Sequence, residues 1–536
     1  MSELIRSSLL WRLCVALCLW LRRSWLGRFF AAVKRAWCAS GTYRLFARLL
    51  TAPSLADRSR LRRFLDRRNR ELRKSGRRWK EYKEDSLFCR ALGAAWQKGK
   101  ESFFLGGLLR NGVTAVLLVL IAAYAPIDYV LREIVCWSTL ASVWDELLMV
   151  FCIFWIVRQR MTAKKPMRSR LTSLDLSLVL YVLCGLALLT YCYADDCFGI
   201  NFTGFRASMQ YILLFFLVTR LIRDERDFLL MYKVMVAVAF LVALYGIWQF
   251  IIGVEIPSNW TDQAEGAVRT RVFSIFPNPN IMGAYMILFA PMAIGMAYAT
   301  DDLATKVFYW FCGLCMCLGC LFTMSRGAWL GLAVAAVLFA LIVDRRLFAM
   351  IVCAAVVACF LPFVRSRISY LFTDEFKASN EAGGRAKRWS TAMSYLDDYD
   401  CWDVGLGYGM YGGAVAMQNQ INPGFMYKYV DNYYVKILAE NGIIGLSAFL
   451  TSVLGLIWNG ARACGKTAKT PYLPLCVGML AGLIGVLVQS FFESIWEEPY
   501  MMALFFAIAG MLIYIGFFRR LNRFPITLKK EGNDHV

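Results

Sequence analysis

The sequence predicts an all-α, polytopic membrane bundle of about 12 transmembrane helices, and two observations lead to this prediction. Hydrophobic residues make up 59% of the 536-residue chain, which is more apolar side chain than one soluble core of this length buries. From residue 112 onward they gather into runs close to the roughly 20 residues that span a bilayer as a helix. The chain therefore needs a surface that faces lipid.

The first 111 residues form a basic region that precedes the bundle. They hold 26 Lys and Arg against 8 Asp and Glu, so about +18 of the net charge of +22 lies here. Trp11, Trp20 and Trp25 are interleaved with arginines, a pattern typical of amphipathic helices on an anionic leaflet. We expect residues 1–111 to be a cytoplasmic, membrane-surface region that contacts anionic membrane lipid. Nothing beyond charge supports a nucleic-acid partner, and we expect none.

The transmembrane domain is expected at residues 112–518, followed by a cytoplasmic tail at 519–536. Its apolar runs predict helices at 112–130, 143–158, 174–194, 206–221, 228–252, 276–299, 305–324, 327–343, 347–364, 433–458, 472–492 and 499–518. Several runs are shorter than a straight span requires. Such runs fit tilted helices or helices whose flanking side chains reach the headgroups.

Basic residues between the runs set the expected orientation. Alternate short connections carry arginines such as Arg160, Arg223, Arg345 and Arg462, all on the side of the basic N-terminus. The excess of Lys and Arg marks that side as cytoplasmic, so both termini are expected there. Residues 365–432 then form a long external loop between helices nine and ten. Loops of this length usually carry function.

Composition excludes several kinds of chemistry. The only histidine is His535, in the last residues of the chain, which removes histidine metal sites, Ser-His triads and histidine general bases. Cysteines such as Cys312 and Cys315 fall inside apolar runs, where Cys packs as a small hydrophobic residue. We expect no metal site, no cofactor and no disulfide framework.

Several arginines, Arg269 among them, fall on the expected external side, which the bias in basic residues disfavours, and four of them are candidate site residues. Arg271 precedes the sixth helix, Arg326 lies in the tight turn between helices seven and eight, and Arg385 and Arg388 lie in the long loop. The guanidinium fork suits phosphate oxygens, so several arginines near the headgroups would suit a lipid-linked pyrophosphate. Each one taken alone could instead reach lipid phosphate or pair with a carboxylate.

Other polar residues near the same face allow two interpretations each. Asn278 and Asn280 flank a proline at a helix start, where they could cap the helix or also contact sugar hydroxyls. Tyr408 lies in the Gly/Tyr-rich patch 405–413, which could be turn chemistry or a sugar-stacking surface. Asp431, at the outer mouth of helix ten, could orient or deprotonate a hydroxyl acceptor or could cap the helix.

Taken together, these features resemble the O-antigen ligase superfamily over roughly residues 170–515. The resemblance rests on Arg271 with Phe276–Asn280, Ser325-Arg326-Gly327, Gly384-Arg385 with Trp389, Gly405-x-Gly-x-Gly409 and the long loop. The ligases also carry His-Asn, nine residues, then Gly-x-x-Gly. Asn432, Gly442 and Gly445 fit that pattern, with Asp431 at the position of the histidine.

The resemblance implies an inverting, metal-independent glycosyltransferase-type ligase or polymerase of surface polysaccharide. It would move a saccharide from an undecaprenyl-pyrophosphate-linked oligosaccharide to a hydroxyl of a polysaccharide or glycolipid acceptor, on the external face of the bacterial plasma membrane. On this analogy Arg271, Arg326 and Arg385 hold the pyrophosphate with Arg388 beside them. Asp431 would act on the acceptor and Asn432 would contact it, although the missing histidine leaves the acceptor and the choice between ligation and polymerisation open.

Two other classes of protein stay open at this point. A transporter or flippase of lipid-linked saccharides would also need about twelve helices, but it would place charged or broken-helix sites near the bilayer midplane. The sequence has few charges in the middle of its apolar runs and no evident repeat between its halves. A non-catalytic membrane scaffold is the third possibility.

Overall fold

The structure is a computed structural model that describes residues 59–85, 112–163, 171–190, 198–255, 270–374, 384–419 and 430–518, apart from isolated positions within or beyond these ranges. Every regular element in these ranges is a helix, as predicted. The tail at 519–536 and most of the basic region before Ser59 lie outside the described residues, so the helices predicted there are not tested.

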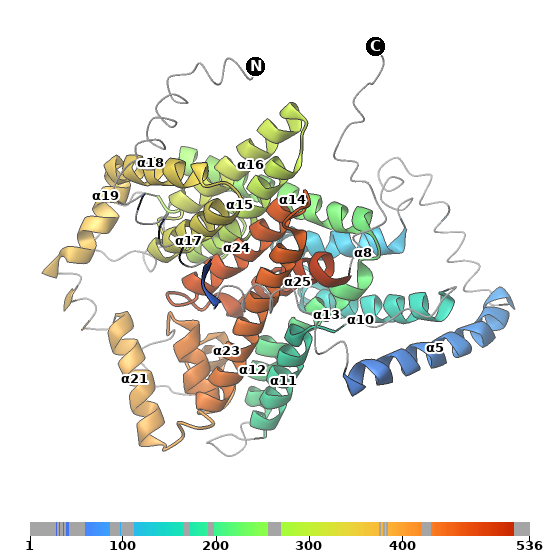
Figure 1. Ribbon diagram of the computed structural model, residues 1–536. Coiled ribbons are helices and arrows are strands. Elements are labelled where there is room, and N and C mark those ends of the chain that lie inside the picture. The colour runs from blue at the N-terminus through green and yellow to red at the C-terminus, as the bar shows by residue number, and fades with distance from the viewer. Residues whose placement is uncertain are drawn as a thin grey trace, which may run out of the picture.

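The helices follow the predicted apolar runs in order. They are α5 (Arg60–Asp85), α8 (Val113–Ala122), α9 (Tyr124–Tyr129), η2 (Val130–Ile134), α10 (Ser138–Thr162), α11 (Ser173–Leu188), α12 (Phe198–Met209), α13 (Ile212–Leu221), α14 (Glu225–Ile252), α15 (Pro279–Ala299), α16 (Leu303–Phe322), α17 (Arg326–Ile342), α18 (Arg346–Phe360), α19 (Pro362–Ser369), η4 (Tyr370–Phe372), α21 (Arg385–Asp398), α22 (Ala414–Gln418), α23 (Tyr433–Thr467), α24 (Leu473–Gln489), η5 (Ile495–Glu497), α25 (Pro499–Ile513) and η6 (Tyr514–Phe518). Figure 1 shows their arrangement.

The described residues contain fewer helices able to cross a membrane than the twelve apolar runs predict. Judged by length and composition, seven helices in the described residues can cross a membrane, and two bent pairs raise this number to nine. Three more apolar helices, α11, α17 and α24, are shorter. An all-helical membrane protein is therefore confirmed, while the count of 12 stays a prediction.

Two predicted spans are bent rather than straight. The run at 112–130 is broken at Ala123, where the two halves meet at 74°. The run at 347–364 ends at Phe360, and the chain turns by 88° into α19 and η4. Leu361 is extended and Pro362 opens α19, because a proline restricts the residue before it and cannot donate a hydrogen bond to the preceding turn. The predicted loop at 365–432 is thus partly helical, containing the end of α19, η4, α21 and α22.

The centre of the bundle is formed by α15, α24 and α25 (Figure 1). In α15 and in residues 499–518, which include α25, 89% of an apolar stretch of 18 residues is buried, whereas in α10 only 28% of such a stretch is buried. Helices α15 and α24 approach closely because glycines on α24 lie against the backbone of α15. A Cβ at Gly478 would lie 2.6 Å from the Pro291 carbonyl oxygen, and a Cβ at Gly482 would lie 2.5 Å from the Leu288 carbonyl oxygen. Small residues allow such contacts where lipid supplies no hydrophobic drive for helices to associate.

Side-chain caps fix where three of the helices begin. The Asn278 side chain caps α15, the Ser325 hydroxyl caps α17, and the Asn432 side chain caps α23. Each accepts a hydrogen bond from a backbone N–H that the first turn leaves without a partner. These caps define the ends of the three helices that surround the candidate site.

Candidate active site

The turn between α16 and α17 is held by two arginines from other parts of the chain. Arg271 donates from Nε to the Thr323 carbonyl oxygen at 3.1 Å. Arg367, on α19, donates from Nε and Nη2 to the Met324 carbonyl oxygen at 3.2 and 2.8 Å. Met324 has a positive φ of 56°, a conformation that needs support in a residue with a side chain. The turn therefore presents Arg326 from a fixed backbone.

Arg326 begins α17, and its guanidinium lies 5.9 Å from the centre of the Tyr370 ring. The ring belongs to η4, the element that follows the bend after α18. A cation over an aromatic face is stabilised by the ring quadrupole. The contact joins the turn at Arg326 to the first part of the predicted loop.

Asp431 pairs with the two arginines of α21. Its Oδ2 lies 2.5 Å from Nη1 of Arg388 and 3.9 Å from Nε of Arg385. Trp389 on the same helix donates from Nε1 to the Val430 carbonyl oxygen at 3.0 Å. These contacts fasten α21 to the residues that lead into α23, and they bring Arg385, Arg388 and Asp431 to one place.

The helix cap at α23 is made by Asn432 rather than by Asp431. The Asn432 Oδ1 accepts from the backbone N–H of Tyr434 at 3.0 Å and of Val435 at 3.2 Å. Asp431 itself has a positive φ of 52°. Of the two roles considered for Asp431, capping therefore belongs to its neighbour, and the carboxylate is directed to the arginines.

Glu493, in the connection between α24 and α25, joins the same region through Asn280. The Asn280 Nδ2 donates a short hydrogen bond to Glu493 Oε2, and Asn280 Oδ1 accepts from Nη2 of Arg271 at 3.2 Å. The amide thus bridges an arginine and a carboxylate. Asn280 has a definite place in the site, whereas Asn278 is the cap of α15 and accepts from the Asn280 N–H at 2.7 Å.

Electrostatic effects link these groups across the site. The pKa of Arg271 is lowered to about 10, chiefly by burial; Glu493 opposes this shift, and Arg326 and Arg385 add to it. Only 6% of Arg271 is exposed. Because charges interact strongly where water is excluded, this mutual influence indicates that the guanidinium groups face a common space. We call Arg271, Arg326, Arg367, Arg385 and Arg388 the arginine cluster.

The structure brings together the four arginines singled out in the sequence, together with Asp431 and Asn280. It adds two residues that sequence reasoning missed as site residues, Arg367 and Glu493. Arg367 could have been noticed as one more arginine in the predicted external loop. Glu493 was visible only as part of an acidic connection, and nothing local distinguishes it from the other acids there.

Tyr408 does not fit the sugar-stacking role considered for it. It is 1% exposed and packs edge-on against Phe205, with ring centres 5.6 Å apart. Its ring fills the space that Gly185 on α11 leaves open. The glycine-rich patch thus places this tyrosine in the core between helices, not on a cleft, and we leave Tyr408 out of the site.

The glycine-rich patch instead docks on a break in α23. At Gly442 the backbone leaves helical geometry, with φ 61° and ψ −167°. The carbonyl oxygens of Ala439 and Glu440 accept from the N–H groups of Leu406 and Gly407, each at 2.8 Å. Buried backbone groups need partners, and here the patch supplies them for the broken turn. The break thereby attaches the segment after α21 to the helix that follows Asp431.

A buried ion pair secures the far end of the patch. Lys436 on α23 lies 2.6 Å from Oε1 of Glu497 and 3.4 Å from Glu440. The other oxygen of Glu497 accepts from the Ala414 N–H at 3.1 Å. The connection between α24 and α25, which carries Glu493, is therefore held against both α23 and the patch.

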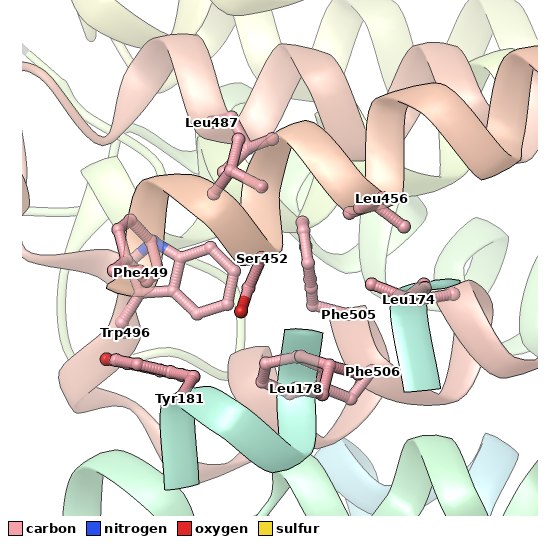
Figure 2. Close-up of a pocket in the computed structure, with 12 residues that line it drawn as sticks. Leu174, Leu178, Tyr181, Phe449, Ser452, Leu456, Leu487, Trp496, Phe505 and Phe506 are labelled. Carbon is pink, nitrogen blue, oxygen red and sulfur yellow. The ribbon is translucent and has the colours of Figure 1, made fainter. Parts of the chain in front are cut away.

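One apolar cavity lies among the helices and contains none of the site residues in its walls (Figure 2). Its lining comes from α11, α23, α24, η5 and α25, and Leu487, Phe449 and Trp496 are among its walls. The Ser452 hydroxyl in the lining donates to the Ser177 carbonyl oxygen at 3.0 Å. With no charged residue in its walls, this cavity is a weaker candidate than the arginine cluster. Among the described residues, no three His, Cys, Asp or Glu side chains are placed to hold a metal ion.

Comparison with known protein families matches residues 311–450 to the family described as O-Antigen ligase. The match runs from α16 into α23, so it contains Arg326, Arg385, Arg388 and Asp431, while Arg271 and Glu493 lie outside it. No curated protein matches the chain. The matched segment holds the turn, the α21 arginines and the entry to α23 that form most of the site, and over this segment the chain is similar to the O-antigen ligase family.

Proposed function

We propose that this membrane enzyme moves a saccharide from an undecaprenyl-pyrophosphate donor to an acceptor hydroxyl, on the external face of the bacterial plasma membrane. The observation that carries the proposal is the arginine cluster, which gathers five guanidinium groups from four separate parts of the chain around two carboxylates. A diphosphate is the ligand that best suits several forked donors in a partly desolvated space.

The proposed reaction follows from this charge arrangement. The acceptor oxygen attacks the anomeric carbon of the donor sugar from the side opposite the diphosphate, and the bond from that carbon to the phosphate oxygen breaks. The leaving diphosphate takes the bonding electrons, and the arginines stabilise its growing negative charge as fixed, preorganised donors. No step of the proposal requires a metal ion.

The external location is inferred from the distribution of basic residues along α17. Arg326 begins the helix, while Arg345 and Arg346 follow its other end. If the end with Arg345 and Arg346 is cytoplasmic, as the bias in basic residues favours, the arginine cluster faces outward. Asp431 is part of this proposed site as the partner that orients Arg388 and Arg385, and Asn432 holds the start of α23 beside the acceptor.

Reconstitution tests the reaction class. The full chain in liposomes, given a lipid-linked oligosaccharide and a polysaccharide acceptor, should release free lipid diphosphate and join the sugar to a second molecule. Growth in the number of sugar repeats would identify a polymerase, and transfer to a different acceptor would identify a ligase. Movement of the intact lipid-linked sugar across the bilayer without release of lipid diphosphate would identify a transporter and would overturn the proposal.

Arg385→Lys should weaken use of the donor about tenfold, because a single ammonium replaces the forked guanidinium. The measurement is the dependence of turnover on donor concentration in the same liposomes. Arg220→Lys is the matched control: Arg220 also pairs with an aspartate, lying 3.2 Å from Asp175, but it belongs to the predicted cytoplasmic end. An unchanged response to donor in Arg385→Lys would remove Arg385 from the pocket.

The partner proposed for the basic region is anionic lipid, and α5 shows how part of that region is held. Asn69 accepts from Nη1 of Arg160 at 2.8 Å, and Gly76 contacts Met161 at the end of α10. Arg63, Arg67 and Phe64 on the same helix are exposed. An arginine near an anionic surface contributes about 1 kcal/mol, and an aromatic side chain suits the interface.

Neutralising Arg63, Arg67 and Arg70 with Gln should therefore reduce stabilisation by anionic lipid. We expect phosphatidylglycerol to raise the unfolding temperature of the purified chain, and to raise it less in the triple variant. Neutral phosphatidylcholine should affect both proteins equally. Equal stabilisation of both proteins by phosphatidylglycerol would show that α5 is not the lipid-binding element.

A further inference from the structure

We propose that Glu493 is the general base of the transfer, the group that removes the proton of the acceptor hydroxyl. This inference rests on the proposed function and assigns a role that the sequence pattern gave to Asp431. The motif on which the resemblance rests has a histidine where this chain has Asp431. The site therefore needs another proton acceptor, or none.

The contacts of the two carboxylates distinguish them. Asp431 is engaged by Arg388 at 2.5 Å and faces Arg385 at 3.9 Å, so its oxygen already accepts from a cation. Glu493 accepts a hydrogen bond from the neutral amide of Asn280. Within the described part of the chain, no Lys or Arg nitrogen forms an ion pair with Glu493 at 4 Å or less. Glu493 is thus the carboxylate of the site that retains capacity to take a proton.

The surroundings of Glu493 suit a base that works near neutral pH. The pKa of Glu493 is raised to about 7, chiefly by burial and then by the charge of Asp431, while Arg385, the hydrogen bond from Asn280 and Arg271 act in the opposite direction. Among the described residues, these four groups influence Glu493 from the segment before α23, from α21, from α15 and from the segment before α15. A general base is most effective when its pKa lies close to the working pH.

Asn280 acts as a positioning residue for both halves of the site. Through one amide group it holds Arg271 at 3.2 Å and Glu493 by a short hydrogen bond. Its backbone carbonyl accepts from Nε2 of Gln489 at 2.8 Å, which fixes it against the end of α24. The Asn280 side chain therefore sets the distance between Arg271, which would bind the donor, and Glu493, which would meet the acceptor.

The proposed step balances without a further reactant. The acceptor O–H bond breaks as its oxygen bonds to the anomeric carbon, and the proton passes to Glu493. The bond between the anomeric carbon and the phosphate oxygen breaks at the same time, and its electron pair leaves with the lipid diphosphate. Glu493 then returns the proton to water or to the departing diphosphate, and the site is restored.

Glu493→Gln tests the assignment because it keeps the shape and an acceptor oxygen for Asn280. We expect turnover to fall about a hundredfold, which is the lower range for loss of a general base, while binding of the lipid diphosphate stays within a few-fold. In the unaltered enzyme turnover should rise with pH through about 7, as Glu493 loses its proton. The variant should lose this rise.

Further variants separate a chemical role from a structural one. Glu498→Gln, in the same connection, should keep both turnover and the pH profile. Formate should partly restore turnover to Glu493→Ala, because it can take the proton in place of the missing side chain. Full turnover with an unchanged pH profile in Glu493→Gln, or absence of any rescue by formate, would overturn the inference. Failure of the proposed function would look different, since the unaltered enzyme would then release no lipid diphosphate.

Discussion

Arg326→Ala should lower turnover about a thousandfold while the protein remains folded. Removing one preorganised donor to a developing negative charge costs about a hundredfold to a thousandfold, and an arginine that stabilises a transferring group can account for more. Arg326 has the firmest placement in the arginine cluster, because its turn is held by Arg271 and Arg367 and its guanidinium lies over Tyr370. The first N–H groups of α17 add positive potential at the same place.

The loss should appear in turnover more than in donor binding. In the proposed reaction the leaving diphosphate gains charge as the sugar departs, so contacts to it would be stronger in the transition state than in the bound donor. Release of lipid diphosphate in liposomes measures this directly. Arg346→Ala, an exposed arginine beyond the other end of α17, should leave turnover unchanged. Thermal unfolding should shift little in either variant; normal turnover in Arg326→Ala would show that the cluster does not hold the donor.

Local patterns in the sequence predicted much of the helical framework. The apolar runs located the helices, and the Asn-Pro and Ser-Arg-Gly motifs marked the starts of α15 and α17, where Asn278 and Ser325 act as caps. These features depend on neighbours within a few residues, so they can be inferred from a single sequence. Arg271, Arg326, Arg385 and Arg388 were selected in a similar way, because the distribution of basic residues predicts that they lie on the external side.

Contacts between distant segments could not be predicted in this way. The bond from Asn280 to Glu493 joins residues more than two hundred positions apart, and Arg367 reaches the turn at Met324 only because the chain bends after α18. Tyr408 was placed at a cleft because its neighbours suggested an exposed turn, but Gly185 on α11 provides a buried space for its ring. Tertiary packing, not local preference, decided each of these positions.

The resemblance motif Asn432…Gly442-x-x-Gly445 acquires a physical explanation from the same packing. Asn432 caps α23, and Gly442 breaks it where the glycine-rich patch docks. On the other side of the break, α23 is the donor. The N–H groups of Ile443 and Ile444 donate to the carbonyl oxygens of Trp402 and Asp403, at 2.8 and 3.1 Å. The spacing between cap and break therefore sets where the segment after α21 is attached relative to Asp431.

Gly442→Ala should destabilise the protein by about 3 kcal/mol or more, combining backbone strain with overpacking. With φ 61° and ψ −167°, this position lies in a region that is essentially restricted to glycine. An added Cβ would also collide with the Asp403 carbonyl group. Gly405, in the glycine-rich patch, has φ 76°, and a Cβ there would lie 2.5 Å from the Asn441 nitrogen. Gly405→Ala should therefore destabilise the protein by a similar amount.

Gly465→Ala is the matched control, because it lies on the same helix and nothing is within 4 Å of the added Cβ. It should leave stability unchanged or raise it by roughly 0.5–1 kcal/mol, since alanine favours a helix over glycine. Thermal unfolding in detergent measures both variants. If Gly442→Ala unfolds at the same temperature as Gly465→Ala, α23 is continuous in solution and the patch is not docked on it. The attachment of α21, and with it the pairing of Arg388 with Asp431, would then need a different explanation.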